Sequence, residues 1–187
     1  MSNDFSRGDY GRPPHRSGDR RGGGRRGIPL SELPADLTES SRRLIGAAIE
    51  VHKAMGPGYD AALYLSAIKG ELAAQSISYK SPHITSVKYR DTQIGTVTCD
   101  LFIDEKFLVQ IVSRTGEVST AERLALRAQL KAANLDLGLI INFSERRLKD
   151  GLVRVLNVDK INAERGVSFE DSDHDGGTDG AMHDFDH

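Results

Sequence analysis

The stretch CDLFIDEKFLVQIVSR, from Cys99 to Arg114, contains two short apolar segments joined by the charged turn DEK. Apolar and β-branched residues on either side of a short polar turn predict two antiparallel strands. The first strand begins with an acid, Asp100, and the second carries one polar residue, Gln110, on the same face as Leu108 and Val112. A buried amide needs hydrogen-bond partners, so we expect Gln110 to bond to the backbone or to Asp100.

The segments around this stretch predict the remaining elements. Apolar spacing predicts helices over residues 37–55, 60–75 and 119–134, with Thr38 capping the first and Ser119 or Thr120 capping the third. Strands are predicted at 77–80, 83–89, 94–103, 106–112 and 135–143, and residues 152–158 fit a strand or a helix. The almost wholly apolar run LDLGLIINF is typical of a strand covered on both faces. This order predicts a mixed sheet with helices packed on it, in an α/β or α+β domain.

The composition limits the class of protein. The chain has 187 residues, a formal net charge of −2 and one cysteine, so no intrachain disulfide is possible and a reducing cytoplasm is the expected location. No apolar run approaches the roughly 18 residues of a membrane span, and no membrane partner is expected. Although the net charge of the whole chain is close to zero, the first 28 residues contain seven arginines and the last 18 contain seven acidic residues.

Both ends of the chain are predicted to be disordered, because they cannot bury enough apolar surface to fold. We therefore expect a basic tail over residues 1–32, a folded domain over 33–165 and an acidic tail over 166–187. The segment RRGGGRRG is a candidate for DNA or RNA binding without sequence preference, since its arginines can pair with phosphates and stack on bases (Arg20, Arg21, Arg25 and Arg26). An inert solubilising tail is the alternative.

The acidic tail contains DSDHDG at residues 171–176, which matches the first half of an EF-hand calcium loop. The twelfth position of that loop is Met182 instead of glutamate, and no helix is predicted beside it. Specific calcium binding is therefore not expected. Another hypothesis is that this tail folds back on the arginines of the basic tail and competes with nucleic acid.

Three segments resemble the bacterial GxxExxY proteins, a branch of the PD-(D/E)XK nuclease-like superfamily. They are LIGAAIEVHKAMGPGYDAALY at 44–64, CDLFIDEKFLVQIV at 99–112 and LGLIINFSERRLKDGLVRVLN at 137–157. The resemblance covers about residues 37–157 and implies an α/β fold whose mixed central sheet is flanked by helices, as in restriction endonucleases. The namesake motif falls on GYDAALY, where Gly58 and Tyr64 match and the glutamate position is Ala61.

The resemblance also locates the superfamily's metal site. Its first acid corresponds to Asp100, and its E-x-K motif falls on Gln110, Ile111 and Val112. A Gln-x-x-x-Tyr pair on the following helix corresponds to Ala125 and Gln129. In an active enzyme two carboxylates at adjacent strand ends hold Mg²⁺, and the lysine orients water and stabilises the developing charge. Here Asp100 is a weak metal candidate, because Gln110 has no charge and Val112 has no ammonium group.

Several of these residues also have a purely structural interpretation. Asp100 fits a strand-end acid that caps a turn, and His52 fits a hydrogen-bonded core histidine. Tyr64 is expected to pack, with its hydroxyl reaching a polar group. Other charged residues fit an ordinary solvated surface (Glu50, Lys53, Arg146, Arg147 and Lys149).

We therefore expect a catalytically inactive nuclease-like domain that acts as a binding module, with nucleic acid as its first candidate ligand and no cofactor. One alternative is a metal-dependent nuclease, which would use Mg²⁺ held by Asp100 with Glu50 or Glu117. The other is a structural or assembly protein, in which the domain forms a homo-oligomer or docks to a protein partner.

Overall fold

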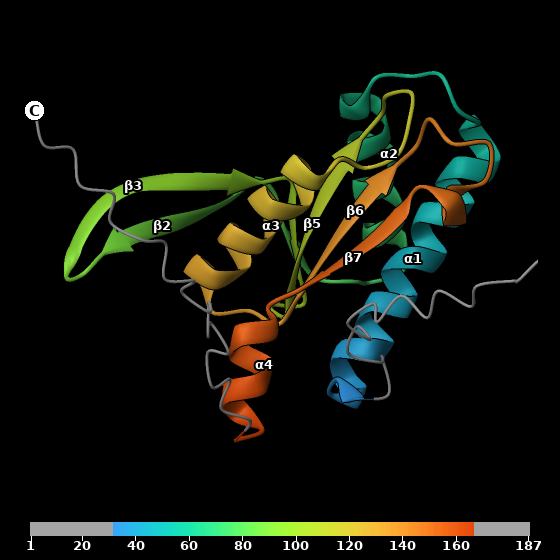
Figure 1. Cartoon of the computed structure of the whole chain (residues 1–187). Helices are drawn as coiled ribbons and strands as arrows, with labels where there is room; N and C mark the ends of the chain where they lie inside the picture. The colour runs from blue at the N-terminus through green and yellow to red at the C-terminus, as the bar shows by residue number, and fades with distance from the viewer. Residues whose placement is uncertain (1–31, 167–187) are drawn as a thin grey trace, which may run out of the picture.

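The computed structural model describes residues 32–166, so the two predicted tails, with their arginine and EF-hand-like motifs, lie outside the described residues. Within this range the chain forms a five-stranded sheet with helices on both faces and a separate two-stranded ribbon (Figure 1). This arrangement confirms the predicted α/β class with a mixed central sheet. No helix in the described range combines the length and apolar character that a membrane crossing requires.

The central sheet has the strand order β1-β4-β5-β6-β7. Its strands are β1 (Tyr79–Lys80), β4 (Leu101–Ile103), β5 (Phe107–Val112), β6 (Leu137–Asn142) and β7 (Leu152–Leu156). Only β5 and β6 are parallel, with Phe107 opposite Leu137, and helix α3 (Thr120–Ala133) connects them. Parallel neighbours need such a crossover, whereas the antiparallel pair of β4 and β5 is joined by the short turn DEK.

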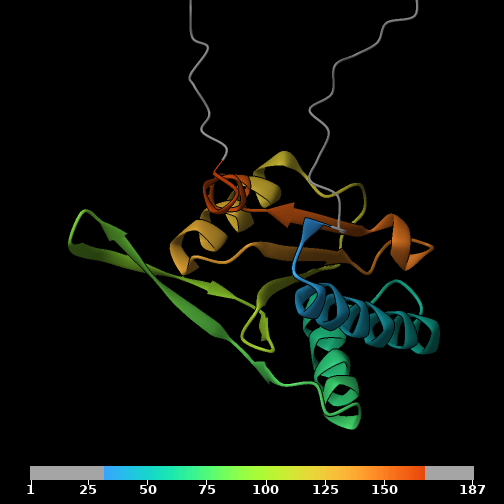
Figure 2. The same cartoon turned by 90° about the horizontal axis from the view of Figure 1, so that it is seen from below.

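Helices α1 (Ala35–Met55) and α2 (Ala61–Ala74) cover one face of the sheet, and α3 covers the other (Figure 2). Successive side chains of β5 point to opposite faces of the sheet and pack in both layers. Phe107, Val109 and Ile111 pack in the cluster with α1 and α2, while Leu108 packs with α3. Every residue of β6 is buried, as predicted for a strand covered on both faces.

Helix α3 lies close against β6. A Cβ atom on Gly138 would lie 2.8 Å from Leu126 Cδ2, so the glycine permits this close approach. Leu126 and Leu130 are both fully buried in this layer. The helix that follows β5 is therefore fixed in position relative to the end of that strand.

The ribbon consists of β2 (His83–Tyr89) and β3 (Thr92–Cys99), which pair only with each other. It reaches away from the body of the domain (Figures 1 and 2). At its base the ring of His83 lies 4.3 Å from that of Phe102, measured between centroids. The Cys99 thiol donates a hydrogen bond of 3.1 Å to the carbonyl of Val109.

The predicted strand over 94–103 is wrong as one element. The structure divides it at Asp100 into β3, which belongs to the ribbon, and β4, which belongs to the sheet. The physical reason is a change of partner. β3 hydrogen-bonds to β2, β4 hydrogen-bonds to β5, and the Asp100 carboxylate accepts a bond from Ile111 N–H at the bend between them.

The helix starts were predicted with mixed success. Helix α1 begins at Ala35 after Pro34, so Thr38 is not its cap and instead donates through Oγ1 to Pro34 O within the first turn, at 3.2 Å. Pro34 precedes the first helical residue with an extended ψ of 137°, and the helix begins directly after it. Ser119 does cap α3, in a capping box with Glu122.

The C-terminal part of the domain contains one element that the sequence predicts and two that it does not. Residues 152–158 fit a strand or a helix, and most of them form strand β7, which follows a short 3₁₀ turn, η2 (Leu148–Asp150). A further helix, α4 (Val158–Glu164), follows at once. Asn157 caps it, since its side chain accepts a bond of 3.4 Å from Lys160 N–H.

Candidate functional site

Asp100 and Gln110 meet at one end of the β4–β5 pair. Leu101 lies opposite Val109 in this antiparallel ladder, so the preceding residue of β4 and the following residue of β5 are neighbours. Val112 lies two residues further along β5 on the same face, where it packs against the α3-side cluster. The structure therefore brings together the three positions that the sequence assigned to the strands.

Asp100 is held by the backbone of β5. Its Oδ2 atom accepts a hydrogen bond of 2.7 Å from Ile111 N–H, and the residue is half-buried. This contact stabilises the bend where the chain leaves the ribbon and enters the sheet. It matches the structural interpretation of a strand-end acid, although the bond crosses to a neighbouring strand and does not close a turn.

The expected partner of Gln110 is not found. Its Oε1 atom is buried, and no donor in the described part of the chain hydrogen-bonds to it. The prediction of a hydrogen bond to the backbone or to Asp100 is therefore wrong for this oxygen. Among residues 32–166, the Asp100 carboxylate accepts its one hydrogen bond from Ile111 N–H. An orphaned acceptor of this kind costs about 1–3 kcal/mol.

Gln129 on α3 shares this property. Within residues 32–166, its Oε1 and that of Gln110 are the two buried side-chain atoms without a hydrogen-bond partner. Gln129 is flanked by Leu126 and Leu130, which pack in the same layer as Leu108 of β5. Ala125, one turn earlier, is exposed. Both glutamines with orphaned oxygens are residues that the sequence resemblance was expected to place at the site.

Ala61 belongs to the opposite layer. It packs against the α1 and α2 cluster, on the other face of the sheet from Gln110 and Val112. The start of α2 is still tied to the end of β5, because Ser113 Oγ donates a 2.6 Å hydrogen bond to Tyr59 O. Ala61 therefore lies near the same strand end without sharing a face with the β5 positions.

Gly58 and Tyr64 have structural roles beside Ala61. Gly58 has φ of +117°, which side chains of other residues disfavour. Tyr64 is fully buried, and its ring stacks on Phe143 at 4.4 Å between centroids. Its hydroxyl donates a 2.6 Å bond to Gly56 O and accepts one of 3.2 Å from Tyr59 N–H. The expected packing of Tyr64 is confirmed.

Asn142, at the end of β6, organises the rim of this site and was not identified as a site residue from the sequence. It is fully buried, and its amide donates to Arg114 O at 2.9 Å and to Gly116 O at 3.0 Å. Its Oδ1 accepts from Arg114 N–H at 3.3 Å and Ser144 N–H at 3.2 Å. The one polar residue in the apolar run LGLIIN was the available signal.

Arg114 completes the rim by linking it to α3. Its guanidinium forms an ion pair with Glu122, with 3.0 Å between Arg114 Nε and Glu122 Oε1. The hydrogen bond from Arg114 is the main reason that the pKa of Glu122 falls from 4.5 to about 2, and Ser119 adds to it. The capping box of α3 and the end of β5 thus form one charged network.

The candidate acids for a magnesium site do not fit such a site. No group of three or more His, Cys, Asp or Glu side chains in the described range is placed to hold a metal ion. Glu50 forms an exposed ion pair with Lys53 at 2.8 Å, and Glu117 is exposed. Mg²⁺ needs oxygen ligands with carboxylate charge, and the strand ends offer one carboxylate and a neutral amide.

The other residues given structural interpretations are arranged as those interpretations require. His52 is half-buried, and its Nε2 lies 2.9 Å from Glu145 O. Arg147 forms an exposed ion pair with Asp150 at 2.8 Å, as expected for a solvated surface. Arg20, Arg21, Arg25 and Arg26 lie outside the described residues.

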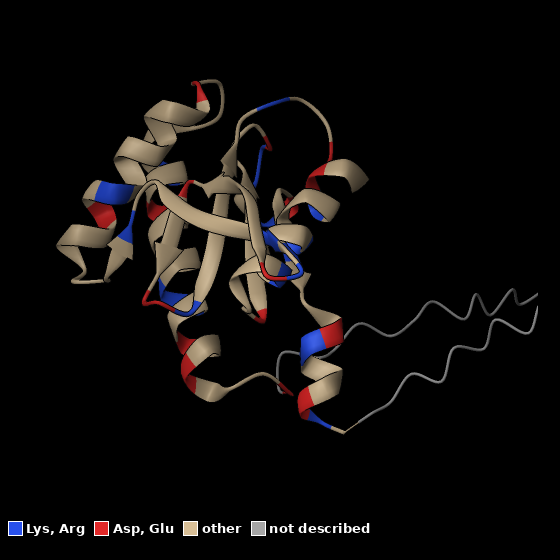
Figure 3. Ribbon diagram, turned by 90° about the vertical axis from the view of Figure 1, so that its left-hand side faces the viewer, with Lys and Arg blue, Asp and Glu red and all other residues tan. Residues whose placement is uncertain are grey.

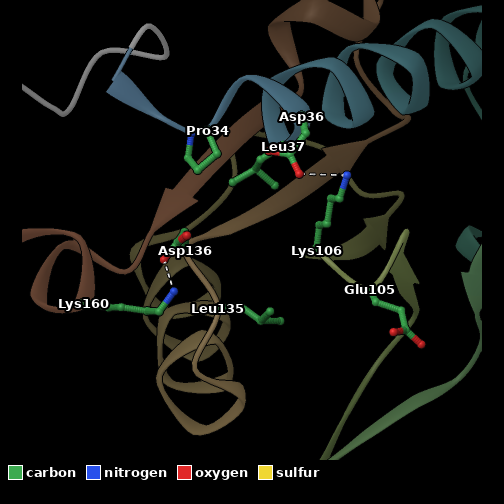
Figure 4. A pocket seen from close by; sticks show the side chains of 8 residues that line it. All are labelled: Pro34, Asp36, Leu37, Glu105, Lys106, Leu135, Asp136 and Lys160. Atoms are coloured by element: carbon green, nitrogen blue, oxygen red, sulfur yellow. Dashed lines mark hydrogen bonds and ion pairs between the residues drawn. The ribbon is translucent and has the colours of Figure 1, made fainter. Parts of the chain in front are cut away.

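A small pocket lies beside Lys106, the residue before β5, and so at the other end of that strand from the site. It encloses about 180 Å³ and is lined by Pro34, Asp36, Leu37, Glu105, Lys106, Leu135, Asp136 and Lys160 (Figure 4). Its charges pair within the wall, with 3.0 Å between Lys106 and Asp36 and 2.5 Å between Lys160 and Asp136. This pocket is separate from the Asp100 strand end.

The described domain matches a protein-family model over most of its length. The family model described as PD-(D/E)XK nuclease superfamily matches residues 38–155, which include both helical layers and nearly all of the central sheet. No curated protein matches the chain.

Proposed function

The chain belongs to the PD-(D/E)XK nuclease superfamily, and from this premise we propose that it binds nucleic acid without cleaving it. The observation that carries the proposal is the strand end at Asp100, where a neutral amide and a valine occupy the positions of the second metal-binding acid and the lysine. Asp100 also uses Oδ2 to accept the Ile111 N–H bond. The donor set thus lacks the charge that a metal-dependent phosphodiesterase needs.

Two features support binding as the remaining activity. The superfamily is one of nucleases, whose substrates are nucleic acids. The arginines of the N-terminal segment add cations that can pair with phosphates whatever the base sequence. We also assign the chain to the GxxExxY branch, on the basis of Gly58 and Tyr64.

The single cysteine supports a cytoplasmic location. Burial, with the charge of Asp100, raises the pKa of the Cys99 thiol to about 11, so the thiol stays protonated and unreactive in the folded chain. A chain with one protected thiol makes no use of an oxidising compartment.

The first experiment separates binding from cleavage. The full-length chain is mixed with labelled single- and double-stranded DNA and RNA, with Mg²⁺ or Mn²⁺. We expect retardation that weakens as salt rises, with the nucleic acid intact. Cleavage that disappears in Asp100→Ala would overturn the proposal. A full-length variant with Arg20, Arg21, Arg25 and Arg26 changed to Gln measures the share of binding that the N-terminal segment supplies.

A second experiment restores the missing groups. The triple variant Ala61→Glu, Gln110→Glu, Val112→Lys is expected to bind Mg²⁺ more tightly than the wild-type chain in calorimetry, because a second carboxylate joins Asp100. Nuclease activity is the second readout. The matched control adds two glutamates and one lysine at exposed positions around the end of α2, as Ala73→Glu, Gln75→Glu and Ala74→Lys. An equal gain in the control would show that the charge acts non-specifically.

An assembly function has one observation in its favour. The ribbon leaves Ile84 and Ile94 more than half exposed, at 61% and 64%. Strand β3 contains no charged residue and pairs with a strand only on its β2 side, which is typical of an edge that can add a further strand. The molar mass in solution, measured by light scattering over a range of concentrations, tests this function. A strict monomer would exclude a homo-oligomer.

A further inference from the structure

A groove runs between the ribbon and the helix that follows β5. One wall is β2, with Thr85, Ser86, Val87 and Lys88, and the other is α3, with Ala128, Lys131 and Ala132. Its volume is about 650 Å³, well above that of the pocket near Lys106. Figures 1 and 2 show the ribbon beside α3, reaching away from the sheet.

The side chains that line the groove suit an anion. Each wall contributes one lysine, Lys88 on β2 and Lys131 on α3, and the β2 wall adds two hydroxyl-bearing residues, Thr85 and Ser86. No acidic residue of the described chain lines it. The other residues of the α3 wall are Ala128 and Ala132, whose side chains are single methyl groups. A ligand can therefore approach the helix closely.

The ion pair of Lys131 does not block this role. Its Nζ lies 3.4 Å from Asp159 Oδ2, but the two side chains are 72% and 78% exposed. Pairs this exposed contribute little to stability, because water and salt screen them. A phosphate that enters the groove can therefore replace Asp159 as the partner of Lys131.

Further cations continue the groove at both ends. Arg123 and Arg127 are exposed on α3, two turns and one turn before Lys131, so helical spacing places the three in a row. At the tip of the ribbon, the Arg90 guanidinium lies 5.4 Å from the centroid of the Tyr89 ring, which is 62% exposed. Elsewhere on the body, Lys and Arg positions are interspersed with Asp and Glu (Figure 3).

We propose that the groove between β2 and α3 binds the phosphodiester backbone of single-stranded nucleic acid. The proposal rests on the nucleic-acid binding proposed above and assigns it to a surface. Lysines on both walls can pair with successive phosphates of one strand. Tyr89 at the exposed ribbon tip offers a ring on which a base can stack, as single-strand binding surfaces do.

The test compares two full-length double variants. Lys88→Gln with Lys131→Gln removes the ammonium groups of the groove. Lys53→Gln with Lys69→Gln is the matched control, because it removes two lysines from α1 and α2 on the other side of the sheet. Binding of a fluorescent oligothymidylate is measured by anisotropy over a range of salt concentrations. Thermal unfolding checks that both variants are folded.

We expect the groove variant to bind about tenfold more weakly, with a salt slope smaller by about 1.4, as for two lost phosphate contacts on a single strand. The control variant should keep the wild-type affinity and slope. If the groove variant binds as the wild type does while the Arg20, Arg21, Arg25 and Arg26 variant loses binding, the groove assignment is wrong and the proposed function stands. If the wild-type chain binds no nucleic acid, the proposed function itself fails.

Discussion

Strands β6 and β3 differ in composition and have opposite surroundings, since β6 is almost wholly apolar and β3 is rich in threonine. All six residues of β6 are buried, whereas Thr92 to Thr96 of β3 are all exposed. β6 pairs with β5 on one side and β7 on the other, with helices over both faces, while β3 pairs with β2 alone. The comparison teaches that in this chain a continuous apolar run marks the strand that is covered on both faces, and a threonine-rich alternating run marks the exposed one.

The largest effect is expected from a cavity in the covered strand. Leu139→Ala should lower the free energy of unfolding by about 3 kcal/mol, because Leu139 is fully buried and the neighbouring side chains cannot fill the space. Urea unfolding measures the loss. The same replacement at Leu124, which is 55% exposed on α3, should change stability by less than about 0.5 kcal/mol. If the two replacements lowered the free energy of unfolding equally, burial would not explain the difference between covered and exposed elements.

The same contrast explains how much of the fold was predictable. The continuous apolar run of β6 and the Ser119 capping box act locally, so the sequence alone predicted both. The division at Asp100 was not predicted, although this acid interrupts the β-rich run of residues 94–103. It depends on a contact with Ile111, which lies on another strand. Helix α4 was missed because its only local signal is the Asn157 cap.

The sequence predicts the positions of the candidate site residues better than it predicts their hydrogen-bond partners. Strand pairing and side-chain alternation correctly place Asp100, Gln110 and Val112 together. They do not reveal that Gln110 Oε1 lacks a donor, because partners depend on the packing of α3 against the sheet. Asn142 escaped notice for a similar reason, since its four hydrogen bonds reach loops on both sides of the strand end.

An intermediate effect is expected where the covered sheet meets solvent, at the Arg114–Glu122 pair. The pKa of Glu122 is lowered in the folded chain, so this stabilisation is present above about pH 4.5 and is lost as pH falls towards 2. Glu122→Gln should therefore lower stability by about 1 kcal/mol at neutral pH, after allowance for screening by solvent. The difference between wild type and variant should vanish near pH 2.

Unfolding followed by circular dichroism across this pH range measures that difference. Glu39→Gln is the control, because Glu39 forms an exposed pair with Arg42 inside one helix. A pH-independent effect of Glu122→Gln would mean that the ion pair does not contribute and that only the helix cap was weakened.

The smallest effect is expected on the ribbon. Ile94→Thr should change the free energy of unfolding by less than about 0.5 kcal/mol, since Ile94 is 64% exposed and threonine keeps the β-branched shape. The matched replacement at Ile140, buried in β6, should cost several times more. A loss at Ile94 as large as that at Ile140 would show that the ribbon is covered in solution, which would favour the assembly function.

Cys99 lies at the junction of ribbon and sheet, and the reaction rate of its thiol can report how often the ribbon opens. Its thiol is 5% exposed and hydrogen-bonded to Val109 O, so an alkylating reagent reaches it only when the ribbon detaches from β5. The rate of alkylation under native conditions therefore measures how often the ribbon detaches from β5. An alkylation rate higher than the rate of global unfolding would show that the ribbon opens while the rest of the domain stays folded. Because no second cysteine competes for the reagent, the unmodified chain can be used for this measurement.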